Sequence, residues 1–250
     1  MQIINDNFQN FKRYNIPKAQ LVIADIPYNL GKNAYGSSPL WYNNGDNKQG
    51  ESDKAGKSFF DTDFNFNLYE MFHFCSRLVI KEPKERNKAG CMIVFCSFLQ
   101  QFHLIEIAKK HGFKNHINLV FYKQTSPQVL KANMRVVGNC EYALLFYRDK
   151  LPKFNNDGKM ILNCMPFLRD DKSVAKIHPT QKPIRLLEYL IRIFTDEGDV
   201  VIDPCCGSGS ALIASENLGR KSYGFEIKKD FFKLAKEKVL THIQPRLFCE

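Results

Sequence analysis

Six short apolar runs recur along the chain, and stretches with helical spacing separate them. Within each run the hydrophobic residues are nearly continuous, which is typical of strands buried on both faces of a parallel sheet. The predicted strands are Leu21–Ala24, Cys91–Cys96, Asn118–Tyr122, Tyr142–Tyr147, Val200–Ile202 and Lys221–Phe225. The predicted helices are Phe98–His111, Pro183–Phe194, Gly209–Leu218 and Lys228–Ile243. This alternation of strands and helices predicts an α/β fold built on an open sheet.

Two stretches have no clear period. Residues 31–66 are rich in glycine, asparagine, serine and lysine, and a loop this long in a compact domain is usually a functional lid or a disordered segment. Residues 148–177 mix charges of both signs and include a turn signal. A chain of 250 residues, 44% of them hydrophobic, can bury one core without disulfides. We therefore expect a single domain over 1–250, with a mobile loop at 31–66 and a short insertion at about 148–177.

The composition narrows the class of partner. A net charge of +10 suggests an anionic partner, with nucleic acid ahead of a membrane. No apolar run approaches the length of a membrane-spanning helix, and the N-terminal residues lack the apolar core of a signal peptide, so we expect a cytoplasmic protein with no membrane contact. The eight cysteines form no Cys-x-x-Cys pair, and no histidine lies at metal-ligand spacing from any of them. We therefore expect reduced thiols and no metal site.

The segment 201–210, with the sequence VIDPCCGSGS, lies where a predicted strand ends and a helix begins. In such sheets ligands bind at the carboxyl ends of strands, and glycines there let the backbone approach the ligand. Glu226 follows the next strand, where a carboxylate can accept both hydroxyls of a ribose. The third glycine of a dinucleotide fingerprint is replaced by Leu212, and Asp203 can meet an ammonium group. These features favour S-adenosylmethionine over a pyrophosphate-containing cofactor.

The segment 24–29, with the sequence ADIPYN, directly follows the first strong strand. It combines an acceptor carboxylate, a proline-restricted turn and an aromatic ring, a set that suits a planar base with an exocyclic amino group. Tyr28 would stack on the base, while Asp25 and a carbonyl near Ile26 would accept the two amino protons. The alternative is a solvent-exposed turn with a helix-capping aspartate, and the segment alone does not decide between the two.

Taken together, these motifs resemble those of the β class of amino-DNA methyltransferases. Asp25-Ile-Pro-Tyr28 is similar to the Asp-Pro-Pro-Tyr catalytic motif of that family, and 203–209 is similar to its Asp-Pro-Phe-x-Gly-Ser-Gly cofactor motif. The catalytic motif precedes the cofactor motif, as in the β class, and His178-Pro-Thr-Gln-Lys-Pro183 matches a segment that this class carries just before the cofactor motif. The resemblance spans nearly the whole chain.

The resemblance implies a Rossmann-like, seven-stranded sheet that is circularly permuted, with S-adenosylmethionine as the methyl donor. Glu226 would hold the ribose, and Thr180 and Lys182 would lie near the cofactor's carboxylate. The implied catalytic residues are Asp25, Ile26, Pro27 and Tyr28. The residues implied on the methionine side are Asp203, Pro204, Cys205, Gly207, Ser208 and Gly209. Ile26 replaces a proline of the family motif, which puts the rate of turnover in doubt.

The implied reaction is methylation of the exocyclic N6 of a flipped-out adenine in double-stranded DNA. Asp25 favours adenine because, in this family, aspartate at that motif position goes mostly with adenine. Three alternatives stay open: an N4-cytosine DNA or RNA amino-methyltransferase, a catalytically weak DNA-binding partner subunit, and a dinucleotide-dependent oxidoreductase, against which Leu212 and the segment 25–28 argue. Since the insertion at 148–177 is short, either the recognised sequence is short or a second copy of the chain, as in a homodimer, shares in reading it.

Three weaker matches complete the set. The segment 121–127 resembles a family segment near the target base, and Asn139-Cys-Glu141 resembles its Asn-x-His-Glu. Asp6 loosely matches an acidic position near the cofactor adenine but equally suits a surface residue. The lysines of the 31–66 loop are expected to contact phosphates; they include Lys32, Lys48, Lys54 and Lys57.

Overall fold

The computed structural model describes residues 1–28, 66–85, 87–124, 128–131, 136–171, 174 and 181–243. Except for Phe66, the loop predicted at 31–66 lies outside the described residues, as do Thr180 and the lysines expected to contact phosphates. Among the described residues no helix is long and apolar enough to span a membrane.

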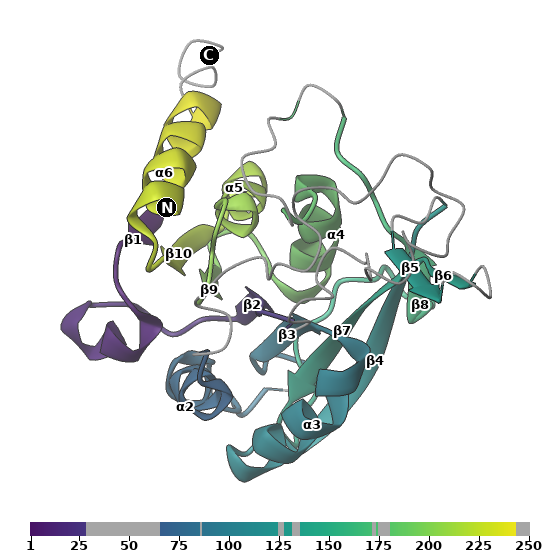
Figure 1. Ribbon diagram of the computed structural model, residues 1–250. Coiled ribbons are helices and arrows are strands. Elements are labelled where there is room, and N and C mark those ends of the chain that lie inside the picture. The colour runs from purple at the N-terminus through teal and green to yellow at the C-terminus, as the bar shows by residue number, and fades with distance from the viewer. Residues whose placement is uncertain are drawn as a thin grey trace, which may run out of the picture.

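The centre of the molecule is an eight-stranded mixed sheet with the order β1-β10-β9-β2-β3-β7-β4-β8 (Figure 1). Its strands in chain order are β1 (Gln2–Ile4), β2 (Leu21–Asp25), β3 (Cys91–Cys96), β4 (Asn115–Tyr122), β7 (Cys140–Tyr147), β8 (Cys164–Pro166), β9 (Val200–Asp203) and β10 (Lys221–Phe225). A separate two-stranded sheet pairs β5 (Gln128–Lys131) with β6 (Val136–Gly138).

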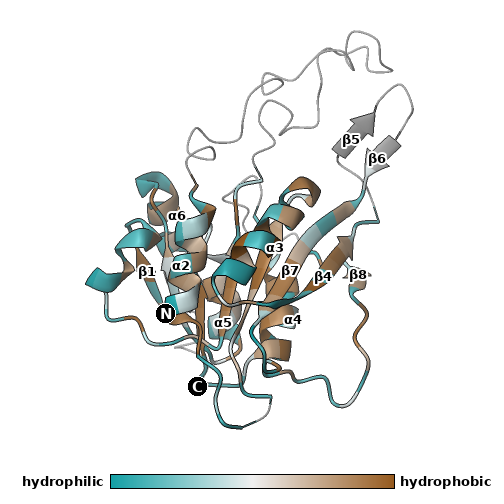
Figure 2. Ribbon diagram, turned by 90° about the horizontal axis from the view of Figure 1, so that it is seen from below, coloured by the Kyte–Doolittle hydropathy of each residue, from teal (hydrophilic) through white to brown (hydrophobic). Residues whose placement is uncertain are grey.

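Helices cover both faces of the sheet. One face packs against the 3-10 helix η1 (Phe8–Arg13), α2 (Leu68–Leu78) and α3 (Gln101–Lys110), the last preceded by the short η4 (Phe98–Gln100). The other face packs against α4 (Ile184–Phe194), α5 (Ser210–Asn217) and α6 (Lys229–Ile243). Figure 2 shows the hydrophobic strands between these more polar layers. All six residues of β3 are buried, as a strand covered on both faces requires.

The predicted α/β fold class is confirmed, with two corrections of detail. The sheet has one strand more than the seven implied, because the three-residue β8 pairs with the edge of β4. The sheet is also not parallel throughout, since β7 runs antiparallel to both β3 and β4. A run that is buried on both faces is hydrophobic whichever way it runs, so its composition carries no information about direction.

Several predicted elements match closely, whereas β1, η1, α2, β5, β6 and β8 were not among the predicted ones. β3 and β10 have the predicted bounds, and α4 and α5 each begin one residue after the predicted start. α2 was not predicted. It begins after Asn67, whose side-chain oxygen accepts a hydrogen bond from the amide of Glu70, as in a normal N-cap. An asparagine alone did not indicate that a helix begins there.

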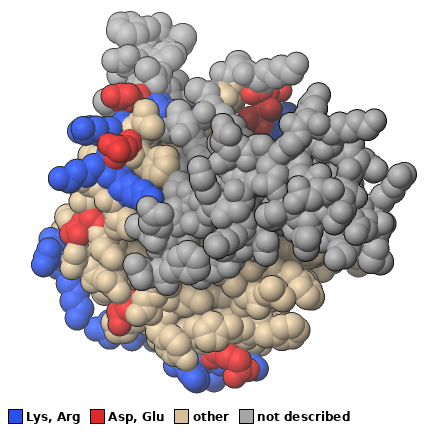
Figure 3. Space-filling model, viewed as in Figure 1, with Lys and Arg blue, Asp and Glu red and all other residues tan. Residues whose placement is uncertain are grey.

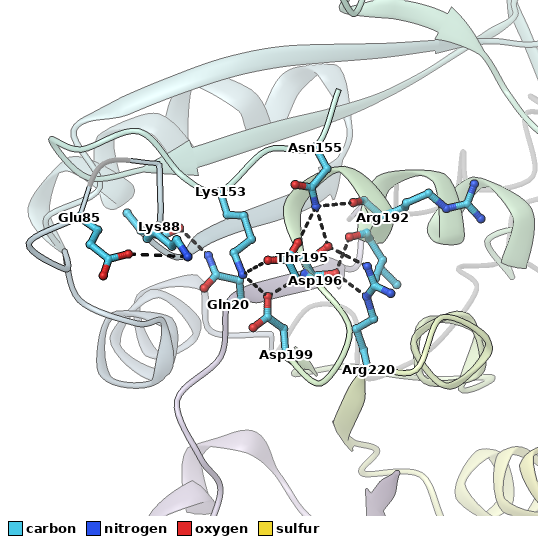
Figure 4. Close-up of polar contacts among 12 residues, drawn as sticks. Gln20, Glu85, Lys88, Lys153, Asn155, Arg192, Thr195, Asp196, Asp199 and Arg220 are labelled. Carbon is cyan, nitrogen blue, oxygen red and sulfur yellow. Dashed lines mark hydrogen bonds and ion pairs between the residues drawn. The ribbon is translucent and has the colours of Figure 1, made fainter. Parts of the chain in front are cut away.

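A polar network ties the start of the 148–177 insertion to the loop that follows α4 (Figure 4). The Lys153 ammonium lies 2.7 Å from an Asp196 oxygen and 2.8 Å from an Asp199 oxygen. The Asn155 side-chain amide donates to the Thr195 carbonyl at 3.0 Å, and Arg220 donates to the same carbonyl at 2.7 Å. Because β9 begins directly after this loop, the network lies at the edge of the sheet opposite to the carboxyl end of β9.

Gly224 of β10 provides a test of the packing behind the 201–210 segment. A β-carbon at this position would lie 2.8 Å from Leu212 Cδ1 and 2.9 Å from Cys206 Cβ. We expect Gly224→Ala to lower the free energy of unfolding by about 1–3 kcal/mol through overpacking, as measured by denaturant unfolding. The control is Lys221→Ala, which makes a substitution at an exposed position of the same strand, where no overpacking arises. Equal effects of the two substitutions would contradict the packing argument.

Candidate active site

The two sequence motifs meet at one edge of the sheet. β2 pairs with β9 in parallel, so the carboxyl ends of both strands lie on the same side, and Asp25 and Asp203 end these strands. The Cys205 sulfur lies 3.5 Å from the main-chain oxygen of Asp25, although the two residues are 180 positions apart. The segments 25–28 and 203–209 therefore lie next to each other in the structure.

The segment 25–28 is held by its backbone and by one buried side chain. The amide of Ile26 donates to the Phe95 carbonyl at 3.3 Å, and the Gln100 side chain donates to the Pro27 carbonyl at 2.8 Å. Ile26 is 2% exposed and packs into the core on the α2–α3 face. Core packing thus restrains the turn at the position where the family motif has a proline ring.

Lys182 lies on this segment. Its ammonium donates to Asp25 Oδ1 at 2.7 Å and to the Tyr28 hydroxyl at 3.0 Å. It also lies 5.1 Å from the centroids of the Tyr28 and Phe95 rings, within cation–π range. The resemblance associated Lys182 with the cofactor's carboxylate, whereas the contacts described for its ammonium are made with the catalytic segment.

Glu141, near the start of β7, is a charged neighbour to which the motif analysis assigned no role. Its Oε2 atom lies 3.2 Å from the Lys182 ammonium, and its Oε1 atom forms an ion pair with Lys123 at the end of β4. The match of Asn139-Cys-Glu141 to a family segment was the available signal, but that match did not indicate which groups the carboxylate contacts.

Burial and these charges set the protonation of the catalytic segment. Burial raises the pKa of Asp25, and the Lys182 ammonium partly offsets that rise. Burial also raises the pKa of Tyr28 well above its ordinary value, so its hydroxyl is neutral at physiological pH. Although burial opposes the charge of Lys182, the groups of Asp25, Tyr28 and Glu141 outweigh it and raise the pKa of the ammonium.

The cofactor motif forms a tight turn with amide groups directed inward. Gly207 and Gly209 have φ values of 47° and 73°, in the left-handed region that favours glycine, and α5 begins immediately after Gly209. The amide of Gly207 donates to Glu226 Oε2 at 3.0 Å, and the amide of Cys205 donates to Asp203 Oδ1 at 3.0 Å. The turn and the carboxylate after β10 therefore form one unit.

Carboxyl groups dominate the electrostatics of this edge. The pKa of Asp203 is raised to about 8, mainly by burial; the hydrogen bond from the Cys205 amide lowers it, and the nearby charges of Asp25 and Glu226 add to the rise. Burial likewise raises the pKa of Glu226. The proximity of these three carboxyl groups favours a cationic ligand at this edge. No cluster of three or more histidine, cysteine or acidic side chains suited to a metal ion occurs among the described residues.

Asp6 has a local structural role in addition to any other. Its Oδ1 atom accepts from the Asn10 side chain at 2.7 Å, and its Oδ2 atom accepts from the Tyr14 hydroxyl at 2.8 Å. These bonds close the first turn of η1 and lower the pKa of the carboxyl.

The fold and the site define a methyltransferase-type α/β protein, and comparison with known proteins gives the family. Residues 19–237 match the N6/N4 family model described as DNA methylase, so the chain belongs to that family. The family assignment predicted from the motifs is confirmed. Because the match covers both β2 and β9, it includes the two strands that end in Asp25 and Asp203.

Individual relatives are similar over most of their length. The Type II methyltransferase M2.DpnII of Streptococcus pneumoniae is 26% identical over 94% of this chain and 87% of its own. The DNA adenine methyltransferase YhdJ of Escherichia coli is 28% identical over 93% of this chain and 80% of its own. The crystal structure of the M1.HpyAVI–SAM complex has the same fold, with a TM-score of 0.67 at 24% identity, over 95% of this chain and 98% of that one.

The raised pKa of Asp203 predicts a pH-dependent loss of stability. Between the ordinary value of 3.8 and about 8, the folded chain keeps a proton on Asp203 that the unfolded chain has lost. The free energy of unfolding therefore falls as pH rises through this window. Since asparagine is neutral throughout, we expect Asp203→Asn to gain stability relative to the wild type between pH 5 and pH 9 (~1–3 kcal/mol), as measured by denaturant unfolding.

The control for this measurement is Asp149→Asn, at a carboxylate that is 62% exposed and distant in sequence from Asp203. The difference between that variant and the wild type should stay constant over the same pH range. A constant difference for Asp203→Asn as well would mean that this carboxyl is ionised in the folded protein at neutral pH.

Proposed function

We propose that this protein transfers a methyl group from S-adenosylmethionine to the exocyclic N6 of a flipped-out adenine in double-stranded DNA. The observation that carries the proposal is the parallel pairing of β2 with β9, which brings Asp25 and Tyr28 beside the turn at 203–209. The segment proposed to bind an amino-bearing base thus lies next to the carboxyl groups proposed to attract a cation. We further infer that the reaction takes place in the cytoplasm.

The residues at this edge of the sheet fit S-adenosylmethionine, which supplies an electrophilic methyl group on a cationic sulfonium when it is bound. Asp203 can pair with the ammonium of its methionine part, and in doing so would release the proton that burial holds on the carboxyl. Pro204, Cys205 and Ser208 belong to the same turn, and Glu226 can accept the ribose hydroxyls. The left-handed Gly207 and Gly209 allow the close backbone approach that such a ligand needs.

At the catalytic segment, Tyr28 would stack on the base, and Asp25 would accept one amino proton. A main-chain carbonyl of the turn formed by Ile26 and Pro27 would accept the other. Accepting both protons draws the amino nitrogen out of conjugation and directs its lone pair at the methyl group. The nitrogen becomes acidic only after it is methylated, so no strong base is required. Catalysis then rests on orientation and on electrostatic complementarity.

Two observations support adenine over cytosine. Aspartate stands at the first position of the catalytic motif, and the relative YhdJ, similar over most of the chain, is a DNA adenine methyltransferase. The residues around Asp25 accept any amino group next to a ring nitrogen, an arrangement that both bases present. Enzymatic digestion of modified DNA followed by nucleoside analysis separates N6-methyladenine from N4-methylcytosine. The same assay on RNA tests whether the protein is an RNA amino-methyltransferase.

Binding of duplex DNA would use the positive charge of the chain. Among the described residues, Lys and Arg side chains lie along the margin of the face drawn in Figure 3, and the exposed side of α6 includes Lys229, Lys233 and Lys236. The insertion at 148–177 would read the target sequence within a single-domain protein. Because this insertion is short, the recognised site is short or is read jointly by two copies of the chain.

Removal of the catalytic carboxylate tests the proposed chemistry. We expect Asp25→Ala to lower the methyl-transfer rate by about a thousandfold, because the base loses a charged hydrogen-bond acceptor, while the affinity for S-adenosylmethionine stays within a few-fold of the wild type. Transfer of a tritiated methyl group to DNA and calorimetric titration of the cofactor measure the two quantities. The control, Glu106→Ala at an exposed carboxylate of α3, should retain both. Full activity of Asp25→Ala would end the catalytic assignment.

Salt dependence tests the nature of the substrate. If lysines neutralise phosphates, DNA binding releases counterions, and the affinity should fall by about 10³-fold between 50 and 200 mM salt when about six phosphates are contacted. Fluorescence anisotropy with a labelled duplex measures this change, with a neutral peptide-nucleic-acid duplex as the matched control. A partner subunit without activity would show this salt dependence but would produce no methylated nucleoside.

A further inference from the structure

Glu141 has a position that the chemistry proposed above does not use. Its side chain is only 16% exposed and lies between two ammonium groups, those of Lys123 and Lys182. Among the described residues, Oε2 accepts no hydrogen bond, and it meets Lys182 as an ion pair at 3.2 Å. Glu141 therefore acts on Lys182 mainly through its charge.

Lys182 transmits that charge to the catalytic segment. Its side chain is 8% exposed, its ammonium hydrogen-bonds to Asp25 and Tyr28, and the rings of Tyr28 and Phe95 each lie 5.1 Å away. The contacts come from β2, from the turn that follows it, from β3 and from β7, so the ammonium is held from several sides. A displacement of Lys182 would therefore alter the position of the Asp25 carboxylate.

We propose that Glu141 is a positioning residue for methyl transfer, which shares the Lys182 ammonium with Asp25 and thereby sets the charge and the orientation of the Asp25 carboxylate. This inference rests on the proposed function. Lys182 takes Oδ1 of Asp25, and Oδ2 is then the oxygen that accepts the proton of the base amino group.

The physical requirement comes from two opposing demands on Asp25. The carboxyl must be ionised to accept an amino proton while it is enclosed by protein and base, and a neighbouring ammonium favours the ionised form. An ammonium paired with Asp25 alone would compete with the amino group for the carboxylate. Because Glu141 attracts the same ammonium, it weakens that competition, and the four charges of Lys123, Glu141, Lys182 and Asp25 balance.

The remaining groups that face Asp25 also belong to the site. Burial raises its pKa, Lys182 lowers it and Glu141 raises it. The titratable groups around it, taken from every neighbouring element, are Tyr28, Cys96, Glu141, Lys182, Asp203 and Cys205. Of these groups, Lys182 lowers the pKa of Asp25 and Glu141 raises it. Removing one or the other should therefore shift this pKa in opposite directions.

The test compares Glu141→Gln, which preserves shape and removes charge, with Lys182→Met. We measure single-turnover methyl transfer to DNA, with saturating S-adenosylmethionine, between pH 5 and pH 9. Removal of Glu141 should move the acidic limb of the profile to lower pH, and removal of Lys182 should move it to higher pH. At pH 7.5 the rate of Glu141→Gln should fall about tenfold with little change in KM for DNA.

A matched control separates charge at the site from charge in general. Glu106→Gln makes the same chemical change on the exposed side of α3, at a carboxylate that is 69% exposed, and should leave the rate and the profile unchanged. Glu141→Asp keeps the charge, so it should keep the wild-type acidic limb and recover part of the rate. If Glu141→Gln matches Glu106→Gln, or if Glu141 and Lys182 variants move the limb in the same direction, the inference is overturned.

A second readout does not depend on turnover. The carboxyl carbon of Asp25, assigned by comparison with Asp25→Asn, can be titrated by ¹³C NMR in the full-length wild type and in both variants. The titration midpoint of Asp25 should fall in Glu141→Gln and rise in Lys182→Met, as expected for the acidic limbs of the rate profiles. Unchanged midpoints would overturn the inference. If instead the midpoints move as expected and the wild type forms no methylated nucleoside, the proposed function fails while the coupling of Glu141 to Asp25 stands.

Discussion

The pairing of β2 with β9 is the constraint on which the rest of the site depends. Register in this pair aligns Leu21 with Val201 and Val22 with Ile202, so both strands end at the same edge of the sheet, with β2 two residues longer there. A parallel sheet holds such an arrangement rigidly because each strand is covered by helices on both faces. Two motifs that are far apart in the chain thus need no loop to bring them together, and the catalytic and cofactor segments keep a fixed separation.

The elements that carry the motifs could be predicted because local sequence specifies them directly. The bounds of β3 and β10 follow from their apolar runs, and the turn after β9 follows from glycines that must adopt left-handed φ. Contacts between residues that are far apart in sequence could not be predicted in this way. Lys182 is 157 residues from Asp25 in sequence, and Glu141 reaches Lys182 from a strand whose direction the composition does not indicate. Long-range charge pairs depend on the topology, which local patterns determine only in part.

Ile26 illustrates how a departure from a motif can be compatible with its geometry. A proline restricts the backbone by its ring, whereas here the restraint comes from burial of the isoleucine side chain and from two hydrogen bonds, one to Phe95 and one from Gln100. These contacts come from β3 and η4, the elements next to β2. The turn is thus held by tertiary packing, and this source of order is invisible when the tetrapeptide is considered alone.

The electrostatics divide the edge of the sheet into two parts. Around Asp25, burial raises the pKa of the carboxyl and the ammonium of Lys182 lowers it, so the lysine favours the ionised form that the proposed acceptor role requires. Around Asp203 no such ammonium is described, and burial holds the proton to about pH 8. A buried carboxyl that is protonated, as at Asp203, becomes charged when a cation approaches, and this favours a positively charged ligand. Without the ligand, the folded chain does not carry an unpaired buried charge. The two aspartates therefore have different electrostatic surroundings, because the Lys182 ammonium lies beside Asp25 and no ammonium is described beside Asp203.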